Sequence, residues 1–343
     1  MTPTSKSKKH QLSSYIILAL ILLMVALGIM SSWYMQRQIR LVTGNSIDVH
    51  SYDFHIAMIS ETPKDPQWIR IVNGARDFGS THAAYVENFG ENLFERRGIQ
   101  ELMQMAIASN VDGIILIGEN SHELVKLVNM AKEQEIPVVL LLTDMMESAR
   151  ISFVGLNNYS LGTMYGTQLV ELSRAKQDHR LRVSVLTETV GDTGLSGVIY
   201  RGIFEALGQY SADMEIQSFE VGSHIEFEVE EQLRELLLSP DGHPDVIVCL
   251  SATTTAIALQ SLVDYNLVGQ VQILGTSDNE LILNGIEMGI ILSTVFINES
   301  GMGSTAIDLL LTYLEFGTAS EYSTVQVQLI TRENLSQFLP VSD

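Results

Sequence analysis

Cysteine is nearly absent from this chain: Cys249 is the only one among 343 residues. One cysteine cannot form an internal disulfide, and it lies far from the N-terminal apolar run that a lipoprotein cysteine would have to follow. It belongs to Val246–Leu250, an apolar and largely β-branched run. We therefore expect a small, buried apolar side chain and not a reactive thiol.

Signatures of catalysis and of metal binding are also missing. The eight histidines are scattered, and no two of them have the i, i+4 spacing of a helical metal site. The chain contains no G-x-S-x-G nucleophile turn and no phosphate-binding glycine loop that ends in lysine. We therefore predict that the protein is not an enzyme and holds neither a metal nor a cofactor. The alternative that the protein is an α/β hydrolase would be supported only by an analogy of fold.

Positive charge is scarce, because 20 Lys and Arg stand against 41 Asp and Glu, a formal net charge of −21. Residues 1–40 contain basic but no acidic residues, so the acidity is concentrated in the remainder. Nucleic acid and anionic lipid both require a basic face. The composition therefore argues against nucleic acid as a partner, and against a domain that lies flat on a membrane.

The longest feature that is present is an apolar run, Tyr15–Met35, preceded by lysines and followed by arginines. A helix needs about 20 apolar residues to cross a bilayer, and aromatic residues mark both ends of this run. The bias of positive charge predicts a cytoplasmic tail at 1–14, a single-pass plasma-membrane anchor at 15–35 and an extracytoplasmic linker at 36–52. A cleaved signal peptide and a buried soluble helix remain alternatives, although the run is long for a signal peptide and no small-residue cleavage pattern follows it.

Beyond residue 52, short apolar runs alternate with segments of helical periodicity. This alternation predicts an α/β protein of two doubly wound parallel-sheet lobes, since one open sheet rarely exceeds about ten strands. Such sheets bind ligands beyond the carboxyl ends of their strands. The expected strands are Phe54–Ile59, Ala83–Phe89, Gly113–Ile117, Val138–Leu142, Ile151–Val154, Leu181–Thr187, Met214–Val221, Val246–Leu250, Gln272–Gly275, Ile291–Phe296 and Val325–Leu329. The expected helices are Ile69–Phe78, Ile99–Ala108, Ser121–Gln134, Tyr159–Leu172, Val198–Leu207, Glu228–Leu238, Thr254–Tyr265, Glu280–Met288 and Gly303–Phe316.

These segments carry an ordered set of motifs. The run Phe54–Ser60, followed by Asp65–Trp68 and Asn73-Gly74, resembles the start of the sugar-binding periplasmic proteins of the ribose-binding type, periplasmic binding protein type I. The resemblance implies two crossed-over lobes, one formed by 53–157 plus 298–322 and the other by 158–297 plus 323–343. Further matching segments are Asn110–Ile117, Ala131–Val139, Val154–Asn158, Arg201–Phe204, His243–Ile247, Gln272–Gly275 and Gly289–Thr294.

The resemblance also implies ligand contacts at strand ends in both lobes. Trp68 would stack on the ligand, while Asp144 and Asp278 would supply carboxylates. From the residues alone, core packing is the alternative for Trp68 and helix capping the alternative for the two aspartates. The pattern departs from the family where arginines are replaced by Met145 and Ile199. The implied ligand-binding residues are Ser60, Asp65, Trp68, Asp144, Thr254, Ser277, Asp278 and Asn298.

We therefore expect a membrane-tethered, extracytoplasmic solute-binding protein that closes on a small polar ligand, sugar or sugar-like, for uptake by an ABC-type permease. Two alternatives stay open. The first is a ligand-sensing partner of a membrane receptor kinase or chemosensory system, and the second is an interaction module without a working site.

Overall fold

The computed structural model describes residue 30 and residues 52–119, 121–175, 180–188, 195–222 and 226–339. The chain divides into two units, Met1–Ser51 and Tyr52–Asp343, and the fold described below is that of the second unit. The predicted anchor Tyr15–Met35 lies outside the described residues, apart from Met30. Among the residues that are described, none of the helices has both the length and the apolarity needed to cross a membrane.

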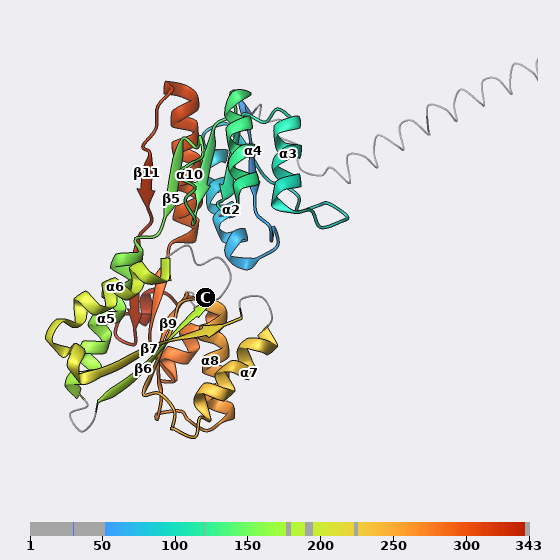
Figure 1. Ribbon diagram of the computed structural model, residues 1–343. Coiled ribbons are helices and arrows are strands. Elements are labelled where there is room, and N and C mark those ends of the chain that lie inside the picture. Colours follow the sequence, from blue (N-terminus) through green and yellow to red (C-terminus); the bar gives the residue numbers. More distant parts are fainter. Residues whose placement is uncertain are drawn as a thin grey trace, which may run out of the picture. The chain divides into compact units, whose positions relative to one another are not determined.

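Two sheets, each of six strands, form the framework of the second unit (Figure 1). The first sheet consists of β1 (Phe54–Ile59), β2 (Ala84–Asn88), β3 (Gly113–Ile117), β4 (Val138–Leu141), β5 (Ser152–Gly155) and β11 (Tyr322–Thr324). The second consists of β6 (Leu181–Glu188), β7 (Met214–Val221), β8 (Val246–Cys249), β9 (Gln272–Thr276), β10 (Ile291–Ile297) and β12 (Val327–Thr331). The predicted architecture of two α/β lobes with parallel sheets is confirmed.

The strand order is β11-β5-β4-β3-β1-β2 in the first sheet and β12-β10-β9-β8-β6-β7 in the second. All neighbouring strands are parallel except β12, which runs antiparallel to β10. An antiparallel strand at the edge of an otherwise parallel sheet is common in α/β proteins. The single strand predicted at Val325–Leu329 was wrong in position, because β12 begins at Val327. The sequence analysis also missed β11, which has three mostly exposed residues and no apolar run.

Helices cover both faces of each sheet. Ile56 and Met58 of β1 pack with α2 and α10, whereas Ala57 and Ile59 point to the opposite face and pack with α3 and α4. This alternation follows from the two-residue period of a strand and explains why the buried strands are apolar throughout. The helices are α2 (Pro66–Ser80), α3 (Ile99–Ala108), α4 (His122–Glu133), α5 (Asn158–Ala175), α6 (Leu195–Leu207), α7 (Glu226–Leu237), α8 (Ala252–Asp264), α9 (Glu280–Glu287) and α10 (Glu299–Phe316), with 3₁₀ turns η1 (Gly208–Asp213) and η2 (Leu335–Gln337).

The chain passes between the two sheets three times. The passages lie at 156–157 between β5 and α5, at Asn298 between β10 and α10, and at 325–326 between β11 and β12. Two backbone hydrogen bonds join them: the Asn298 N–H donates to the Gln326 carbonyl over 3.2 Å, and the Val325 N–H donates to the Gly155 carbonyl over 3.1 Å. The three passages therefore lie next to one another, which is the arrangement that hinge bending requires.

Glycines allow the helices on one face of each sheet to approach very closely. A Cβ atom added to Gly303 on α10 would lie 1.9 Å from the Ile71 carbonyl oxygen of α2, and one added to Gly74 would lie 2.0 Å from the Ser300 carbonyl oxygen. In the second lobe, a Cβ on Gly162 of α5 would lie 2.1 Å from the Ile199 carbonyl oxygen of α6. Backbone atoms cannot rotate away from such a clash, so these positions require glycine.

We predict that Gly303→Ala lowers the free energy of unfolding by about 1–3 kcal/mol, the usual effect of overpacking a tight interface. Gly197→Ala is the matched control, since Gly197 lies in a helix and an added Cβ has no neighbour within 4 Å. The control should be as stable as the wild type or slightly more stable, because alanine favours helix. Differential scanning calorimetry measures both, and equal melting temperatures for Gly303→Ala and the wild type would contradict the prediction.

Cys249 should be unreactive in the folded protein. It is fully buried in β8, and burial raises the pKa of its thiol, so the reactive thiolate does not form near neutral pH. We expect no reaction with Ellman's reagent at pH 8 before denaturation and one thiol per chain in guanidinium chloride. Rapid reaction of the native protein would contradict the assigned burial.

Candidate functional site

Three of the predicted site residues, Ser60, Asp65 and Trp68, follow β1 at the carboxyl edge of the first sheet. Ser60 is buried, and its Oγ accepts a hydrogen bond from the Thr62 N–H over 3.1 Å. Asp65 is the N-cap of α2, where Oδ1 accepts from the Gln67 N–H over 2.9 Å and from the Trp68 N–H over 3.1 Å. These two bonds satisfy two N–H groups that a helix leaves unpaired at its start. Both side chains thus shape the loop that leads from β1 into α2.

Trp68 is a core residue in this structure. Only 2% of it is exposed, and it packs with Ile71, Val72 and the strand residues of the α2–α10 face. Its Nε1–H donates to Asn88 Oδ1 over 2.8 Å, and the Asn88 amide in turn donates to the Pro63 carbonyl over 2.8 Å. A ring enclosed in this way has no open face for a ligand, so the stacking role implied by the resemblance is corrected to one in packing.

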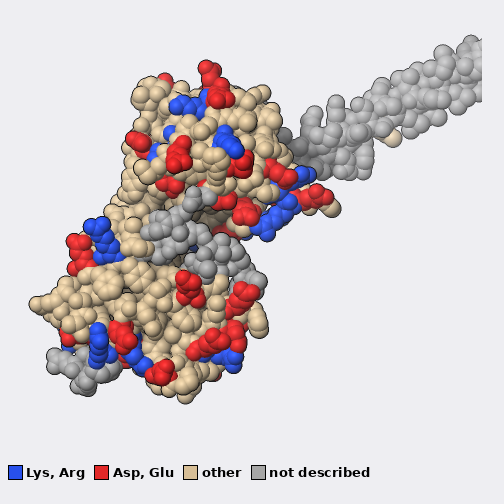
Figure 2. Space-filling view, in the orientation of Figure 1, with Lys and Arg blue, Asp and Glu red and all other residues tan. Residues whose placement is uncertain are grey.

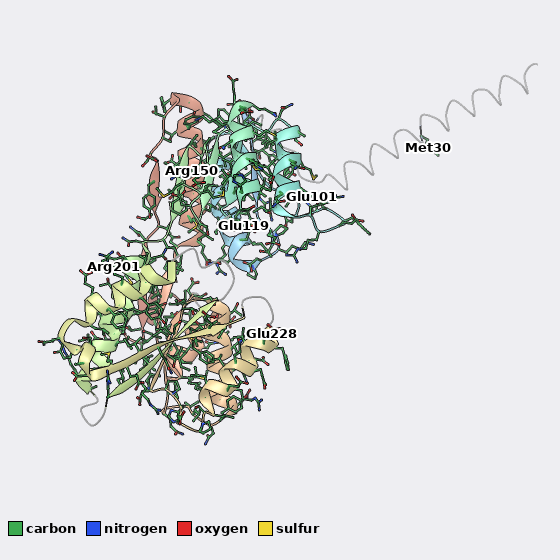
Figure 3. The ribbon with its side chains drawn as sticks, in the orientation of Figure 1. Met30, Glu101, Glu119, Arg150, Arg201 and Glu228 are labelled. Atoms are coloured by element: carbon green, nitrogen blue, oxygen red, sulfur yellow. The ribbon has the colours of Figure 1, made fainter. Side chains whose placement is uncertain are left out.

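Asp144 is engaged by a partner that the sequence analysis did not identify. Arg150 binds its carboxylate with two nitrogens, Nη2 lying 2.8 Å from Oδ2, and the Arg150 side chain is only 8% exposed. Arg150 lies two residues before β5 and also donates to the Glu321 carbonyl, next to β11. Figure 3 labels Arg150 within the first lobe. The ion pair holds the Asp144 carboxylate in place, and its role as a ligand carboxylate stays a prediction.

Two further predicted residues cap helices. Thr254 is buried and forms a reciprocal capping box with Ser251 at the start of α8, with its Oγ1 3.3 Å from the Ser251 N–H. Asn298 caps α10, and its Oδ1 accepts from the Gly301 N–H over 2.8 Å. Capping of this kind stabilises a helix by about 1 kcal/mol. Thr254 and Asn298 still lie just beyond β8 and β10, at the carboxyl edge of the second sheet.

Ser277 and Asp278 follow β9 in a conformation that few residues adopt. Ser277 has φ +98°, which is strained for any residue other than glycine. Its N–H donates to the Val295 carbonyl over 2.8 Å, and its carbonyl accepts from Thr294 Oγ1 over 2.8 Å. These bonds fix the turn beside β10. Asp278 is half-buried, and no hydrogen bond or ion pair of its carboxylate is found within the described part of the chain.

A buried hydroxyl network holds the adjacent strand ends in place. The Tyr165 hydroxyl of α5 lies 2.6 Å from Thr276 Oγ1, which donates to the Cys249 carbonyl over 2.8 Å. The Thr276 N–H donates to Thr255 Oγ1 over 3.0 Å. Burial raises the pKa of Tyr165, so its hydroxyl stays protonated and available as a donor. The network ties α5 and α8 to the ends of β8 and β9.

Arg70 and Glu299 form an ion pair that the sequence analysis missed. Arg70 lies in the second turn of α2, Glu299 is the first residue of α10, and Arg70 Nε donates to Glu299 Oε2. This hydrogen bond raises the pKa of Arg70, although partial burial opposes it, and the charges of Asp278 and Asp65 act in the same direction as Glu299. The two partners are 229 residues apart in the chain. They come together because α2 packs against α10, where Gly74 contacts the backbone of Ser300.

A separate hollow opens between the loops that follow β1 and β2. It has a volume of about 350 Å³ and is lined by Thr62–Asp65 and by residues of the 90–97 loop. Phe94 at the tip of that loop is fully exposed.

Figure 2 shows acidic side chains spread over the visible face with basic ones among them, so this face offers no continuous basic surface for nucleic acid. Within the part of the chain that the structure describes, no cluster of three or more potential metal ligands is found.

Loss of the Trp68–Asn88 bond should destabilise the first lobe. Asn88→Ala leaves the Trp68 Nε1–H and the Pro63 carbonyl without partners, and each buried unpaired group costs about 1–3 kcal/mol. Asn284→Ala on α9 is the matched control, because Asn284 is exposed and makes no side-chain hydrogen bond with the described residues. Thermal denaturation should show a clear decrease for the first variant alone. Equal stability of the two variants would mean that the indole nitrogen finds another acceptor.

Several solved structures share this fold. A glucose–galactose binding protein, GanP of Geobacillus stearothermophilus, superposes with a TM-score of 0.70 at 21% identity, covering 82% of this chain and 98% of that one. The myo-inositol binding protein of Caulobacter, solved with myo-inositol, gives 0.70 at 19% identity over 84% of this chain and 96% of its own. XylFII, in complex with LytSN, gives 0.67 at 24% identity over 81% and 98%. No curated protein matches the chain.

The sequence profile of the family described as "Periplasmic binding protein domain" matches residues 56–319, which is most of the chain. The matched range runs from β1 to just beyond α10 and includes five of the six strands of each sheet, leaving out β11 and β12. The family consists of binding proteins, in agreement with the expectation that this protein is not an enzyme. With its two crossed-over α/β lobes and its profile match across both of them, the chain belongs to the periplasmic binding protein domain family.

Proposed function

We propose that this protein is an extracytoplasmic solute receptor that closes its two lobes on a small, hydroxyl-rich ligand. The observation that carries the proposal is the family match across both lobes, residues 56–319. In a parallel sheet the carboxyl edge is where ligands bind, and here that edge carries the carboxylates of Asp65 and Asp278, together with the buried Ser60. The three adjacent passages between the sheets supply the hinge for closure.

The chemistry of this edge favours hydrogen bonding over stacking. Trp68 and Phe89 are buried in the first lobe, so neither ring is open to a sugar face. Hydroxyl and carboxylate groups remain, and these recognise the hydroxyl groups of a polyol. The structural neighbours include a glucose–galactose binding protein, an arabinose binding protein and a myo-inositol binding protein. We infer a neutral sugar or cyclic polyol as the ligand class for this chain.

We further propose that Tyr15–Met35 tethers the receptor to the plasma membrane, with residues 1–14 in the cytoplasm and the two lobes outside. The support is the sequence itself: an apolar run of membrane length, more positive charge before it than after it, and no cysteine near it. A tethered receptor can deliver its ligand to an ABC-type permease in the same membrane.

A second candidate role is ligand sensing for a membrane protein. The specific observation in its favour is that one structural neighbour, XylFII, was solved in complex with a second protein, LytSN. The two roles differ in what the closed receptor contacts and share the same ligand site. Deletion of the gene should abolish uptake of labelled ligand if the receptor serves a permease. It should leave uptake intact and abolish ligand-induced transcription if the receptor serves a sensor.

We predict that a neutral sugar or polyol stabilises the protein against heat. Ligand at 100 times its dissociation constant adds about 2.7 kcal/mol to the free energy of unfolding. The panel is D-glucose, D-galactose, D-xylose, L-arabinose, D-ribose and myo-inositol, with glycine and glutamate as control solutes. Differential scanning fluorimetry should show a shift of several degrees for at least one panel member and none for the controls. A panel without any effect would contradict the proposed function.

The tether predicts an intact N-terminus on the membrane-bound protein. Membranes from expressing cells, washed with carbonate, should retain the full-length chain, and N-terminal sequencing should begin within residues 1–14. A mature chain that begins near residue 31 would show instead that the apolar run is a cleaved signal peptide.

A further inference from the structure

Arg70 presents a partly solvent-exposed cation at the carboxyl edge of the first lobe. Its side chain is 40% exposed, whereas Trp68 and Ile71 on the same helix are buried in the core. Arg70 follows the Asp65 cap of α2 by about one turn, so it lies at the end of the helix that faces the loop after β1. A long basic side chain in this position reaches beyond the strand ends while its stem packs on the helix.

Glu299 fixes the direction of this cation. Its side chain is 8% exposed, and it accepts the hydrogen bond from Arg70 Nε. A buried carboxylate needs such a partner. The hydrogen bond from Nε fixes the orientation of the planar guanidinium. The two Nη groups, which carry four of the five N–H donors of arginine, have no hydrogen-bond partner among the described residues. They remain as a free donor face.

Asp278 supplies the complementary acceptor from the second lobe. The Ser277 N–H bond to the Val295 carbonyl places Asp278 beside the end of β10, and the chain runs from there through Asn298 directly to Glu299. Its carboxylate is half-exposed and unpaired within the described part of the chain, and its charge acts on Arg70. An unpaired donor from the first lobe and an unpaired acceptor from the second therefore both lie next to the passage from β10 into α10.

We propose that Arg70 and Asp278 together grip adjacent hydroxyl groups of the ligand, one hydroxyl accepting from Arg70 Nη and its neighbour donating to the Asp278 carboxylate. The inference rests on the proposed function and names the two residues that join the lobes through the ligand. Arg70 is a contact that the resemblance did not imply. Because each residue belongs to a different lobe, the full set of bonds forms only on closure.

The charges around Arg70 also favour an uncharged ligand over a negatively charged one. Glu299 accepts a hydrogen bond from Arg70, and the negative charges of Asp278 and Asp65 also act on the guanidinium. The guanidinium is already neutralised by Glu299, so the remaining field is negative and repels an anion. The site therefore prefers an uncharged polyol to its carboxylic acid, and galactose to galacturonate.

Isothermal titration calorimetry of the full-length protein tests whether Arg70 and Asp278 bind the ligand. The probe is whichever panel member, from D-galactose to myo-inositol, gives the largest thermal shift. Arg70→Gln and Asp278→Asn should each weaken binding about tenfold or more, the effect of losing a hydrogen bond to a charged group. Arg76→Gln is the matched control: Arg76 lies on the same helix and is 42% exposed, but it pairs with Glu91 and bonds to the Val86 carbonyl. The control should bind within twofold of the wild type.

A second variant separates binding from folding. Arg70→Gln alone leaves the buried Glu299 without its partner, so Arg70→Gln with Glu299→Gln replaces the ion pair by two amides. This double variant should fold and still bind about tenfold more weakly. If D-galactose binds, D-galacturonate should bind the wild type at least about tenfold more weakly, and Asp278→Asn should narrow that difference.

The outcomes distinguish this inference from the proposed function. Wild-type protein that binds no panel member overturns both. Wild-type binding with unchanged affinity in the folded Arg70 variants overturns the inference alone, as does an equal loss in Arg76→Gln. Tighter binding of galacturonate than of galactose overturns the charge argument.

Discussion

The close backbone approach of α2 and α10 is the constraint on which the rest of the first lobe depends. Gly74 and Gly303 let the two helices meet without side chains between them. Arg70 and Glu299 lie four residues before these glycines on their respective helices, so the glycine contact brings the ion pair together. The same packing encloses Trp68 and, through Asn88, holds the loop that follows β1. Helix packing, loop shape and the position of the exposed cation thus share one cause.

The fold was largely predictable because hydrophobic periodicity encodes it. The buried strands of both sheets are apolar on both faces, and each amphipathic helix repeats its apolar face every three or four residues. The failures occurred where that signal is absent. β11 has three residues, mostly exposed, and β12 begins two residues later than its pattern suggests because 325–326 cross between the sheets. A short edge strand is defined by its partner, and a sequence does not show the partner.

The site was less predictable, for a different physical reason. The predicted site residues do follow strands in the structure. The partners of some of their side chains, however, are set by the tertiary structure, and a sequence does not show these partners. Asp144 looks like a free carboxylate until Arg150 is placed beside it, and Trp68 looks like a platform until Asn88 and the core enclose it. Arg70 was not singled out in the sequence, because its partner Glu299 is 229 residues away in the chain. Local caps can be anticipated from residue type, whereas long-range ion pairs cannot.

The interleaved order of the strands has a consequence for biosynthesis. The first sheet and its covering helices are completed by α10 and β11, which the ribosome makes only after the whole series β6–β10 of the second lobe. Until then the face of α2 that bears Ile71, Gly74 and Ala75 has no helix to cover it, and its apolar surface is open to aggregation or to a chaperone. Neither lobe is a contiguous stretch of the nascent chain, so neither lobe can be completed before the C-terminal segments are synthesised. The protein has to postpone its final packing until nearly all of its residues have been synthesised.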